Sequence, residues 1–153
     1  MSALEKVCTC FEKNNIPYAL VGGYAVALHG VPRGTFDMDF IIRFRENDFI
    51  ALEAAMISIG FKSRLPVSAK EVFQFRQEYI DNRNLIAWTF INQTNAMELV
   101  DIVLTDNLED VSTVNKIIGT TKIQVLSKAD LINMKKRAGR PQDLIDVNFL
   151  ERK

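Results

Sequence analysis

The chain of 153 residues is poor in the residue types that build disulfide frameworks and structural zinc sites. It has only two cysteines and one histidine. Cys8 and Cys10 stand two positions apart in a segment with helical periodicity, and side chains at this spacing point to different faces of a helix. We therefore expect neither a disulfide nor a zinc site. Cys8 is predicted to fill the core and Cys10 to be a surface thiol.

The chain also lacks an excess of either charge and any long hydrophobic run. Lys plus Arg equal Asp plus Glu at 19 each, so the formal net charge is zero. Proteins that coat duplex nucleic acid usually have a basic excess, so any contact with nucleic acid here must rest on a local patch. No apolar stretch approaches the length of about 20 residues that crosses a bilayer, and the N-terminus lacks a leader pattern. We expect a cytoplasmic protein without a membrane partner.

What the chain does contain is typical of one soluble domain. Apolar residues make up 48% and charged residues 25%, and the length suffices for a substantial core. We predict one α/β domain over residues 1–153, with a mixed sheet flanked by helices. Its core covers residues 1–107, and a helical extension covers residues 108–153.

The hydrophobic periodicity and the capping residues predict the order of the elements. Helices are expected from the Ser2 cap to about residue 14, and over 24–28, 46–59, 108–118, 127–138 and from 141 onward. Strands are expected over 18–21, 38–42, 97–104 and 122–125. The segment 61–91 is predicted to be rich in β-structure, with turns at Pro66 and at Asp81-Asn82.

Two aspartates begin one of the predicted strands. Asp37 and Asp39 are two residues apart, so their side chains project from the same face. Two carboxylates held close together repel each other unless a cation lies between them, which suits Mg²⁺. The alternative is an acidic strand edge without a metal. A phosphatase-type aspartyl nucleophile is disfavoured, because that site follows an apolar strand whereas these residues precede one.

A Gly-Gly turn precedes these aspartates, between a predicted strand and a predicted helix. Gly22 and Gly23 would allow backbone N–H groups to approach a phosphate near the start of the helix. No Gly-Lys-Ser/Thr follows, which excludes a Walker-type P-loop. A phosphate cradle together with metal-binding carboxylates is what phosphoryl or nucleotidyl transfer requires.

A third carboxylate should come from the strand over residues 97–104. Glu98 and Asp101 are an odd number of residues apart, so they face opposite sides of a regular strand. Asp101 has apolar neighbours on both sides, and its burial without a partner would be costly. Asp101 is therefore the preferred third carboxylate, and Glu98 is the reserve.

Several conspicuous side chains have simpler structural interpretations. His29 is expected to be a structural residue rather than a base. Trp88 is expected to pack against a sheet face, although an aromatic platform for a base is the alternative. The basic run 135–137 is most simply a solvated helix face, and Arg140 could pair with Asp143 instead of a phosphate.

Two groups of residues resemble known motifs. The run Gly22-Gly23-x-Ala25…His29-Gly30-x-x-Arg33-x-Thr35-x-Asp37-x-Asp39 resembles the signature of the nucleotidyltransferase superfamily. The run Ser127-Lys128-Ala129-Asp130-Leu131…Lys135…Ala138-Gly139-Arg140-Pro141-x-Asp143-Leu144…Asp146 is similar to the AbiEii-type branch, the toxin half of type IV toxin–antitoxin systems. The two runs cover most of the chain in the expected order.

The resemblance implies a minimal nucleotidyltransferase fold whose catalytic core is residues 1–107. It implies two Mg²⁺ ions that grip a nucleoside triphosphate, with Asp37 and Asp39 as metal ligands. Asp101 would complete the site and help to deprotonate an acceptor hydroxyl. The residues that would bind the nucleotide are Gly22, Gly23, Arg33, Thr35, Lys135 and Arg140.

The sequence departs from the family pattern at one phosphate ligand. Many catalytic members have Ser directly after the first Gly of the turn, where this chain has Gly23 followed by Tyr24. The chain also lacks the larger C-terminal domain of many relatives. Two hypotheses follow: a transferase acting on an RNA such as tRNA, a protein or a small molecule, or a weakly active or inactive module that binds nucleotide or an antitoxin.

Overall fold

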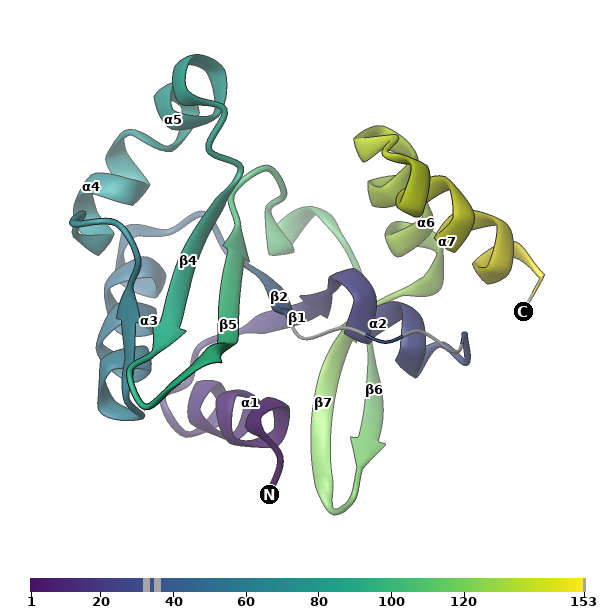
Figure 1. The fold of residues 1–153 in the computed structure, drawn as a ribbon, viewed down its shortest axis with the longest axis horizontal. Coiled ribbons are helices and arrows are strands. Elements are labelled where there is room, and N and C mark those ends of the chain that lie inside the picture. Colours follow the sequence, from purple (N-terminus) through teal and green to yellow (C-terminus); the bar gives the residue numbers. More distant parts are fainter. Residues whose placement is uncertain (32–33, 35–36, 153) are drawn as a thin grey trace.

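The computed structural model describes residues 1–31, 34 and 37–152, and its centre is one mixed sheet of seven strands (Figure 1). The strand order is β3-β4-β5-β2-β1-β7-β6. The strands are β1 (Tyr18–Val21), β2 (Asp37–Ile42), β3 (Phe61–Ser63), β4 (Ala87–Asn92), β5 (Asn95–Val103), β6 (Thr113–Ile118) and β7 (Thr121–Leu126). Strands β2 and β5 are parallel, as are β1 and β7, and the other neighbours are antiparallel.

Seven helices accompany this sheet in the described part of the chain. They are α1 (Ala3–Lys13), α2 (Gly22–Leu28), α3 (Glu46–Ser58), α4 (Ala69–Gln74), α5 (Arg76–Arg83), α6 (Lys128–Ala138) and α7 (Pro141–Glu151). Capping explains several of these boundaries: Ser2 and Glu5 form a capping box at α1, and Ser127 caps α6. Gly139 ends α6 in the left-handed conformation, and Pro141 begins α7.

A large aromatic part of the core lies on one face of the sheet. Phe40 of β2 contacts Phe11 of α1, and Trp88 of β4 stacks against Phe49 of α3. All four side chains are at most 2% exposed. Helices α1 and α3 therefore cover this face, while the alternate residues of β2, β4 and β5 point to the other side. This confirms that Trp88 packs in a sheet face, where its ring is not accessible to a base.

Four expectations about local structure and exposure were wrong. The segment 61–91 contains helices α4 and α5 between its strands, and Asp81-Asn82 lies inside α5 instead of a turn. The expected helix over 108–118 is a short 3₁₀ turn at Leu108–Asp110 followed by β6. Cys10 is 6% exposed, because its side chain faces α3 and its Sγ donates to the carbonyl of Ala55.

The strands β6 and β7 form a hairpin that joins the main sheet through the pairing of β7 with β1. The segment after residue 107 therefore begins with the 3₁₀ turn, continues as part of the sheet and becomes α-helical only from α6. The division of the chain at residue 107 stays a prediction. None of the described helices is long and apolar enough to cross a membrane.

Candidate active site

The site is built at the parallel pairing of β2 with β5. Its register places Asp39 opposite Asp101 and Asp37 opposite Leu99. Because side chains alternate along a strand, Asp37 and Asp39 share the face opposite the core, and Asp101 lies beside Asp39 on that face. Asp37 is exposed and the other two are half-buried. The structure thus brings together three carboxylates that are far apart in the sequence.

The carboxylates of Asp39 and Asp101 interact strongly. Burial raises the pKa of Asp39 to about 7, and the charge of Asp101, a hydrogen bond with Asp101 and the charge of Asp37 add to this effect. Thr89 of β4 donates from its hydroxyl to Asp101 Oδ1 at 2.5 Å, and the register places Thr89 opposite Asp101. In the absence of a cation, a proton held between the two aspartates relieves their repulsion.

Gly22 lies directly against this pair. It has a φ of +69°, which is unfavourable for residues with a side chain. A Cβ added to Gly22 would lie 2.8 Å from Cγ and 2.9 Å from Cβ of Asp39, closer than van der Waals contact allows. Gly23 is the next, buried residue of α2. A glycine at position 22 therefore lets the β1–α2 turn approach Asp39.

Lys135 brings a positive charge towards the same place from α6. The residue is 6% exposed, and its side chain forms ion pairs with Asp143 (3.4 Å) and Asp146 (2.9 Å) of α7. Its charge also lowers the pKa of Asp39, against the stronger effects of burial and Asp101. Lys135 is thus a buried cation that two aspartates hold near the carboxylates.

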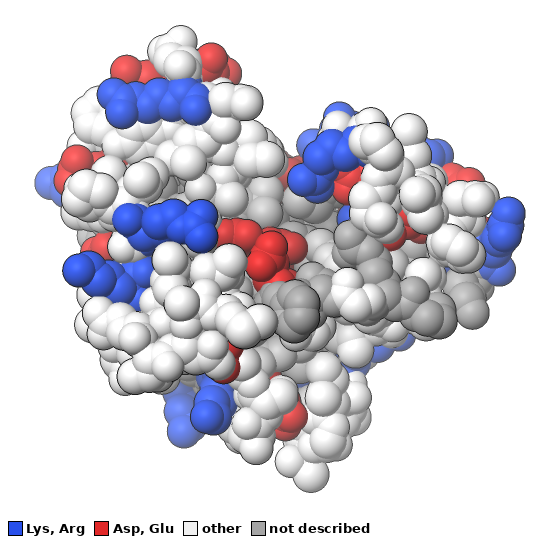
Figure 2. Space-filling view, in the orientation of Figure 1, with Lys and Arg blue, Asp and Glu red and all other residues white. Residues whose placement is uncertain are grey.

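Arg140 precedes α7 and binds Asp143 through its guanidinium, with Nε 2.7 Å from Oδ2. The side-chain hydrogen bond with Asp143 raises the pKa of Arg140, and the charge of Asp39 raises it further. The pairing with Asp143 that the sequence left open is therefore present, and Arg140 still lies within electrostatic reach of Asp39. Figure 2 shows acidic atoms at the base of a notch between the sheet and the pair of helices α6 and α7.

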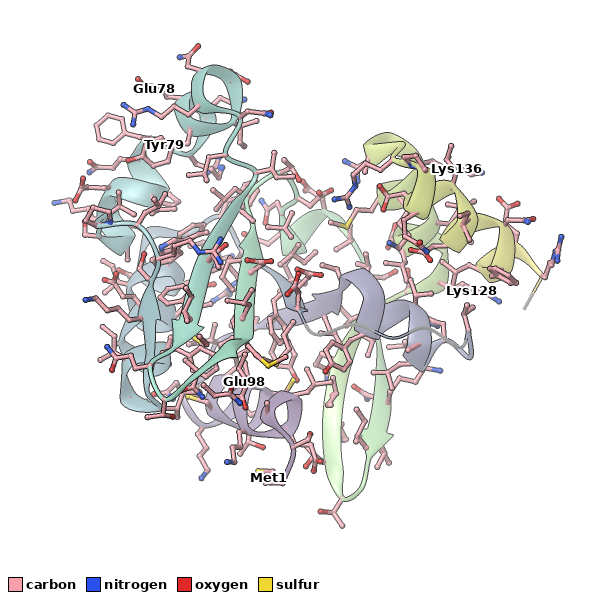
Figure 3. The ribbon with its side chains drawn as sticks, viewed as in Figure 1. Met1, Glu78, Tyr79, Glu98, Lys128 and Lys136 are labelled. Atoms are coloured by element: carbon pink, nitrogen blue, oxygen red, sulfur yellow. The ribbon has the colours of Figure 1, made fainter. Side chains whose placement is uncertain are left out.

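The remaining candidates lie elsewhere. Arg33 and Thr35 fall outside the described residues. Glu98 lies near the β4–β5 hairpin (Figure 3), where Asn92 Nδ2 and Asn95 Nδ2 donate to its carboxylate at 2.9 and 3.1 Å. His29 contacts the carbonyl of Leu126 through Nε2 at 2.8 Å, in agreement with a structural residue.

The donor set suits a divalent cation, although the side chains do not form a ready-made cage. Within the described ranges, no group of three or more His, Cys, Asp or Glu side chains is already arranged around a common metal position. Oxygen ligands are nevertheless what Mg²⁺ prefers. Burial raises the pKa of Asp39 most, and the charges of Asp101 and Asp37 add to this effect, which a bound cation would oppose. The metal-binding and catalytic roles of Asp37, Asp39 and Asp101 stay predictions.

The sequence did not assign Thr89, Asp143 or Asp146 to this site, although it offered Asp143 as a partner of Arg140. Thr89 gave no signal, because its role depends on the register of β4 with β5. Asp143 and Asp146 stood within the second motif run, but their ion pairs with Lys135 depend on how α6 packs against α7. The spacing of Asp143 and Asp146 along a helix, which places both on one face, is the signal that could have indicated them.

The fold and the family matches define this protein as a nucleotidyltransferase. Residues 8–153 match the family described as nucleotidyl transferase AbiEii toxin of type IV toxin–antitoxin systems. The chain belongs to this family, which confirms the resemblance noted in the sequence. No curated protein sequence matches the chain.

Solved structures show the same fold at low identity. ANT(2″)-Ia in complex with adenylyl-2″-tobramycin is 15% identical, with a TM-score of 0.60 over 96% of this chain and 84% of that one. The lincosamide antibiotic adenylyltransferase LnuA with bound lincomycin is 15% identical, with a TM-score of 0.61 over 99% and 97%. An antigenic nucleotidyltransferase-like protein from Paracoccidioides brasiliensis is 18% identical, with a TM-score of 0.59 over 98% and 77%.

Proposed function

We propose that this chain transfers a nucleotidyl group from a nucleoside triphosphate to an acceptor hydroxyl, with two Mg²⁺ ions held by Asp37, Asp39 and Asp101. The acceptor class comprises an RNA end such as that of tRNA, a protein side chain and a small molecule. The observation that carries the proposal is the register that places Asp39 beside Asp101, directly against the Gly22 turn.

Each group of residues would have a distinct role in the reaction. Bound Mg²⁺ would lower the pKa of the acceptor hydroxyl and stabilise charge on the phosphates. Thr89 donates to Asp101 Oδ1 and so orients this carboxylate, which would accept the proton of the acceptor hydroxyl. Gly22 and Gly23 would give the phosphates access to backbone N–H groups. Lys135 and Arg140 would place positive charge near the triphosphate, as would Arg33, with Thr35 as a further contact.

The first experiment is a calorimetric titration of ATP, GTP, CTP and UTP in the presence of Mg²⁺. Wild type should bind at least one nucleotide saturably, and the double variant Asp37→Asn, Asp39→Asn should lose this binding. A matched control is the double variant Asp81→Asn, Asp110→Asn, which removes two exposed aspartates elsewhere. Equal binding by both double variants would contradict the assignment of the site.

A transfer assay then tests turnover. Wild type incubated with the nucleotide labelled at its α-phosphate should label an acceptor hydroxyl, and Asp101→Asn should abolish the labelling. Magnesium removal with EDTA should abolish it as well. Labelling that persists without a divalent cation would refute the metal-dependent mechanism.

A second function is favoured by Gly23, which has no hydroxyl to offer a phosphate. In this alternative the chain binds a nucleotide or an antitoxin without turnover. Saturable nucleotide binding without transfer to RNA, protein or small molecules would favour it.

Because the family is described as a toxin of type IV toxin–antitoxin systems, the main proposal includes that this chain acts as a toxin in the cytoplasm. Expression of wild type should then arrest growth, whereas expression of Asp39→Asn should not.

A further inference from the structure

One face of the β3–β4–β5 half of the sheet carries no helix. Side chains that point to the core from β4 and β5, such as Trp88 and Val100, are at most 2% exposed. The alternate side chains are half-buried or exposed: Ala87, Thr89, Ile91, Met97, Leu99, Asp101 and Val103. In Figure 1 these two strands face the viewer without a covering helix. This open face is continuous with the carboxylates, because Asp101 belongs to it.

Two basic residues continue this face at its β3 edge. Lys62 lies in β3 and Arg64 directly follows the strand, and both are exposed. The backbone N–H of Arg64 donates to the carbonyl of Thr89 at 2.9 Å, so Arg64 stands next to Thr89. Neither basic side chain has an ion-pair partner in the described part of the chain. Figure 2 shows basic side chains beside the acidic patch.

The basic residues nearer to α7 differ in this respect. Lys135 is held by Asp143 and Asp146, and Arg140 by Asp143. Lys62 and Arg64 differ from them in having no carboxylate partner among the described residues.

The order of residues across the sheet gives the site a side towards β3 and a side towards β1. Hydrogen-bonded neighbours run from Arg64 through Thr89 and Asp101 to Asp39. The Gly22 turn lies beyond Asp39, on the β1 side. With about 4.8 Å between strands, Arg64 stands roughly 10 Å from Asp101 on the β3 side. In nucleotidyl transfer the attacking hydroxyl and the leaving group lie on opposite sides of the phosphorus. A triphosphate on the Gly22 side therefore leaves the β3 side to the acceptor.

We infer that the open face of β3, β4 and β5 binds a single-stranded nucleic acid acceptor, with Lys62 and Arg64 contacting its phosphates and its 3′ hydroxyl directed at Asp101. This inference rests on the proposed function. Once Mg²⁺ neutralises the carboxylates, the positive charge of Lys62 and Arg64 beside them attracts a polyanion. The half-exposed aliphatic side chains of Ile91, Leu99 and Val103 offer an apolar floor to unpaired bases.

The test measures the binding of a fluorescein-labelled single-stranded RNA of about 12 nucleotides with a free 3′ hydroxyl, by anisotropy without nucleotide. The double variant Lys62→Gln, Arg64→Gln removes the two charges. The matched control is Lys122→Gln, Arg152→Gln, which neutralises one exposed Lys and one exposed Arg elsewhere. Nucleotide binding in the presence of Mg²⁺ is measured by calorimetry on the same preparations, so that the proposed function is tested separately.

We expect the Lys62, Arg64 variant to bind the RNA about tenfold more weakly than wild type and the control. The slope of the logarithm of its RNA-binding constant against the logarithm of the salt concentration should be shallower by about 1.4. This difference corresponds to the loss of two phosphate contacts on a single strand. Nucleotide binding should be unchanged in both variants.

Three results would overturn the inference while leaving the nucleotide site intact. In the first, wild type binds the nucleotide but does not bind the RNA. In the second, both double variants lose RNA binding equally. In the third, wild type transfers the nucleotidyl group to tobramycin in preference to RNA. Absence of nucleotide binding by wild type would instead count against the proposed function.

Discussion

Asp39 has an ordinary pKa of 3.8, which burial and the charge of Asp101 raise to about 7. Between these values the folded chain keeps a proton that the unfolded chain has released. The free energy of unfolding must therefore fall as the pH rises through this window, and it levels off above about pH 7. The free energy lost is regained only if the charge on Asp39 is removed or neutralised.

The variant Asp39→Asn should consequently be more stable than wild type at high pH. In EDTA at about pH 8, we expect its melting temperature to exceed that of wild type by at least about 3 °C, and the gain should shrink towards pH 4. Thermal unfolding followed by circular dichroism measures this difference. Asp110→Asn, at an exposed position, should show no such pH dependence. An equal gain at both pH values would mean that the pKa of Asp39 is not raised.

Gly22 gives a second prediction at the scale of a single residue. Ala at position 22 must adopt a φ of +69° and also displace the Asp39 carboxylate. Gly139 has a similar φ of +66°, but an added Cβ there meets only an ordinary contact of 3.7 Å. We expect Gly139→Ala to cost about 1 kcal/mol, the penalty of the left-handed conformation.

Gly22→Ala should cost at least twice as much and should also weaken nucleotide binding, because the clash falls on Asp39. Denaturant unfolding and calorimetry measure the two effects. If both variants lose the same stability, the close approach of Gly22 to Asp39 is unimportant.

At the scale of elements, helices α6 and α7 are joined by a buried ion network and by an exposed ion pair. Lys135 lies between Asp143 and Asp146 with all three side chains buried, whereas Lys136 pairs with Glu151 at the surface. Lys135→Met would remove the buried cation between Asp143 and Asp146, although Arg140 would still pair with Asp143. We expect it to destabilise the chain by about 3 kcal/mol, the usual cost of breaking a buried pair from one side.

The neighbouring variant Lys136→Met is the matched control, since it removes the same kind of charge from the same helix. Its exposed pair should contribute less than about 1 kcal/mol. Urea denaturation at constant salt measures both. A small effect of Lys135→Met would show that the aspartates are stabilised by other contacts.

The elements that the sequence predicted well are those with strong end signals. Ser127, Gly139 and Pro141 mark the ends of α6 and α7, and the structure places the helices there. Helix α4 was missed although Ser68 and Glu71 form a capping box. The aromatic and β-branched residues nearby outweighed that signal. Strand β6 was missed because its stability comes from pairing with β7, which no local pattern reports.

Some features of the candidate site could likewise be predicted from the sequence, and others could not. The shared face of Asp37 and Asp39 follows from strand alternation alone, and the approach of Asp101 follows once the two strands are neighbours. The contact of Gly22 with Asp39 and the ion pairs of Lys135 could not be predicted, because they depend on distances between packed elements. The basic pair Lys62 and Arg64 was missed because its segment was not resolved into a strand and helices.

At the scale of the whole molecule, α6 and α7 stand to one side of the sheet across the notch (Figures 1 and 2). An ion pair between Arg137 and Asp106 at 2.6 Å and bonds from Ser112 to Asp130 link them to the sheet side. If Lys135 or Arg140 contacts a triphosphate bound at Asp39, the nucleotide links both sides of the notch.

Hydrogen exchange should reveal this link. Without nucleotide, amides of α6 and α7 should exchange faster than those of β2 and β5, which lie within the sheet. Saturating Mg²⁺ and nucleotide should slow exchange in α6 and α7, and the hairpin tip at 118–121 should be unaffected. Unchanged exchange in α6 and α7 would mean that the nucleotide contacts the sheet side alone.

The parallel register of β2 with β5 also determines which changes in chain length the protein tolerates. A single residue inserted between Leu99 and Asp101 would turn the carboxylate of Asp101 into the core and expose an aliphatic residue in its place. A residue inserted in the turn between β4 and β5, where the chain reverses at Gln93 and Thr94, leaves the pairing untouched. Among variants with one inserted residue, those that remain folded and active should therefore carry the insertion in the β4–β5 hairpin turn. None should carry it in the few residues before Asp101.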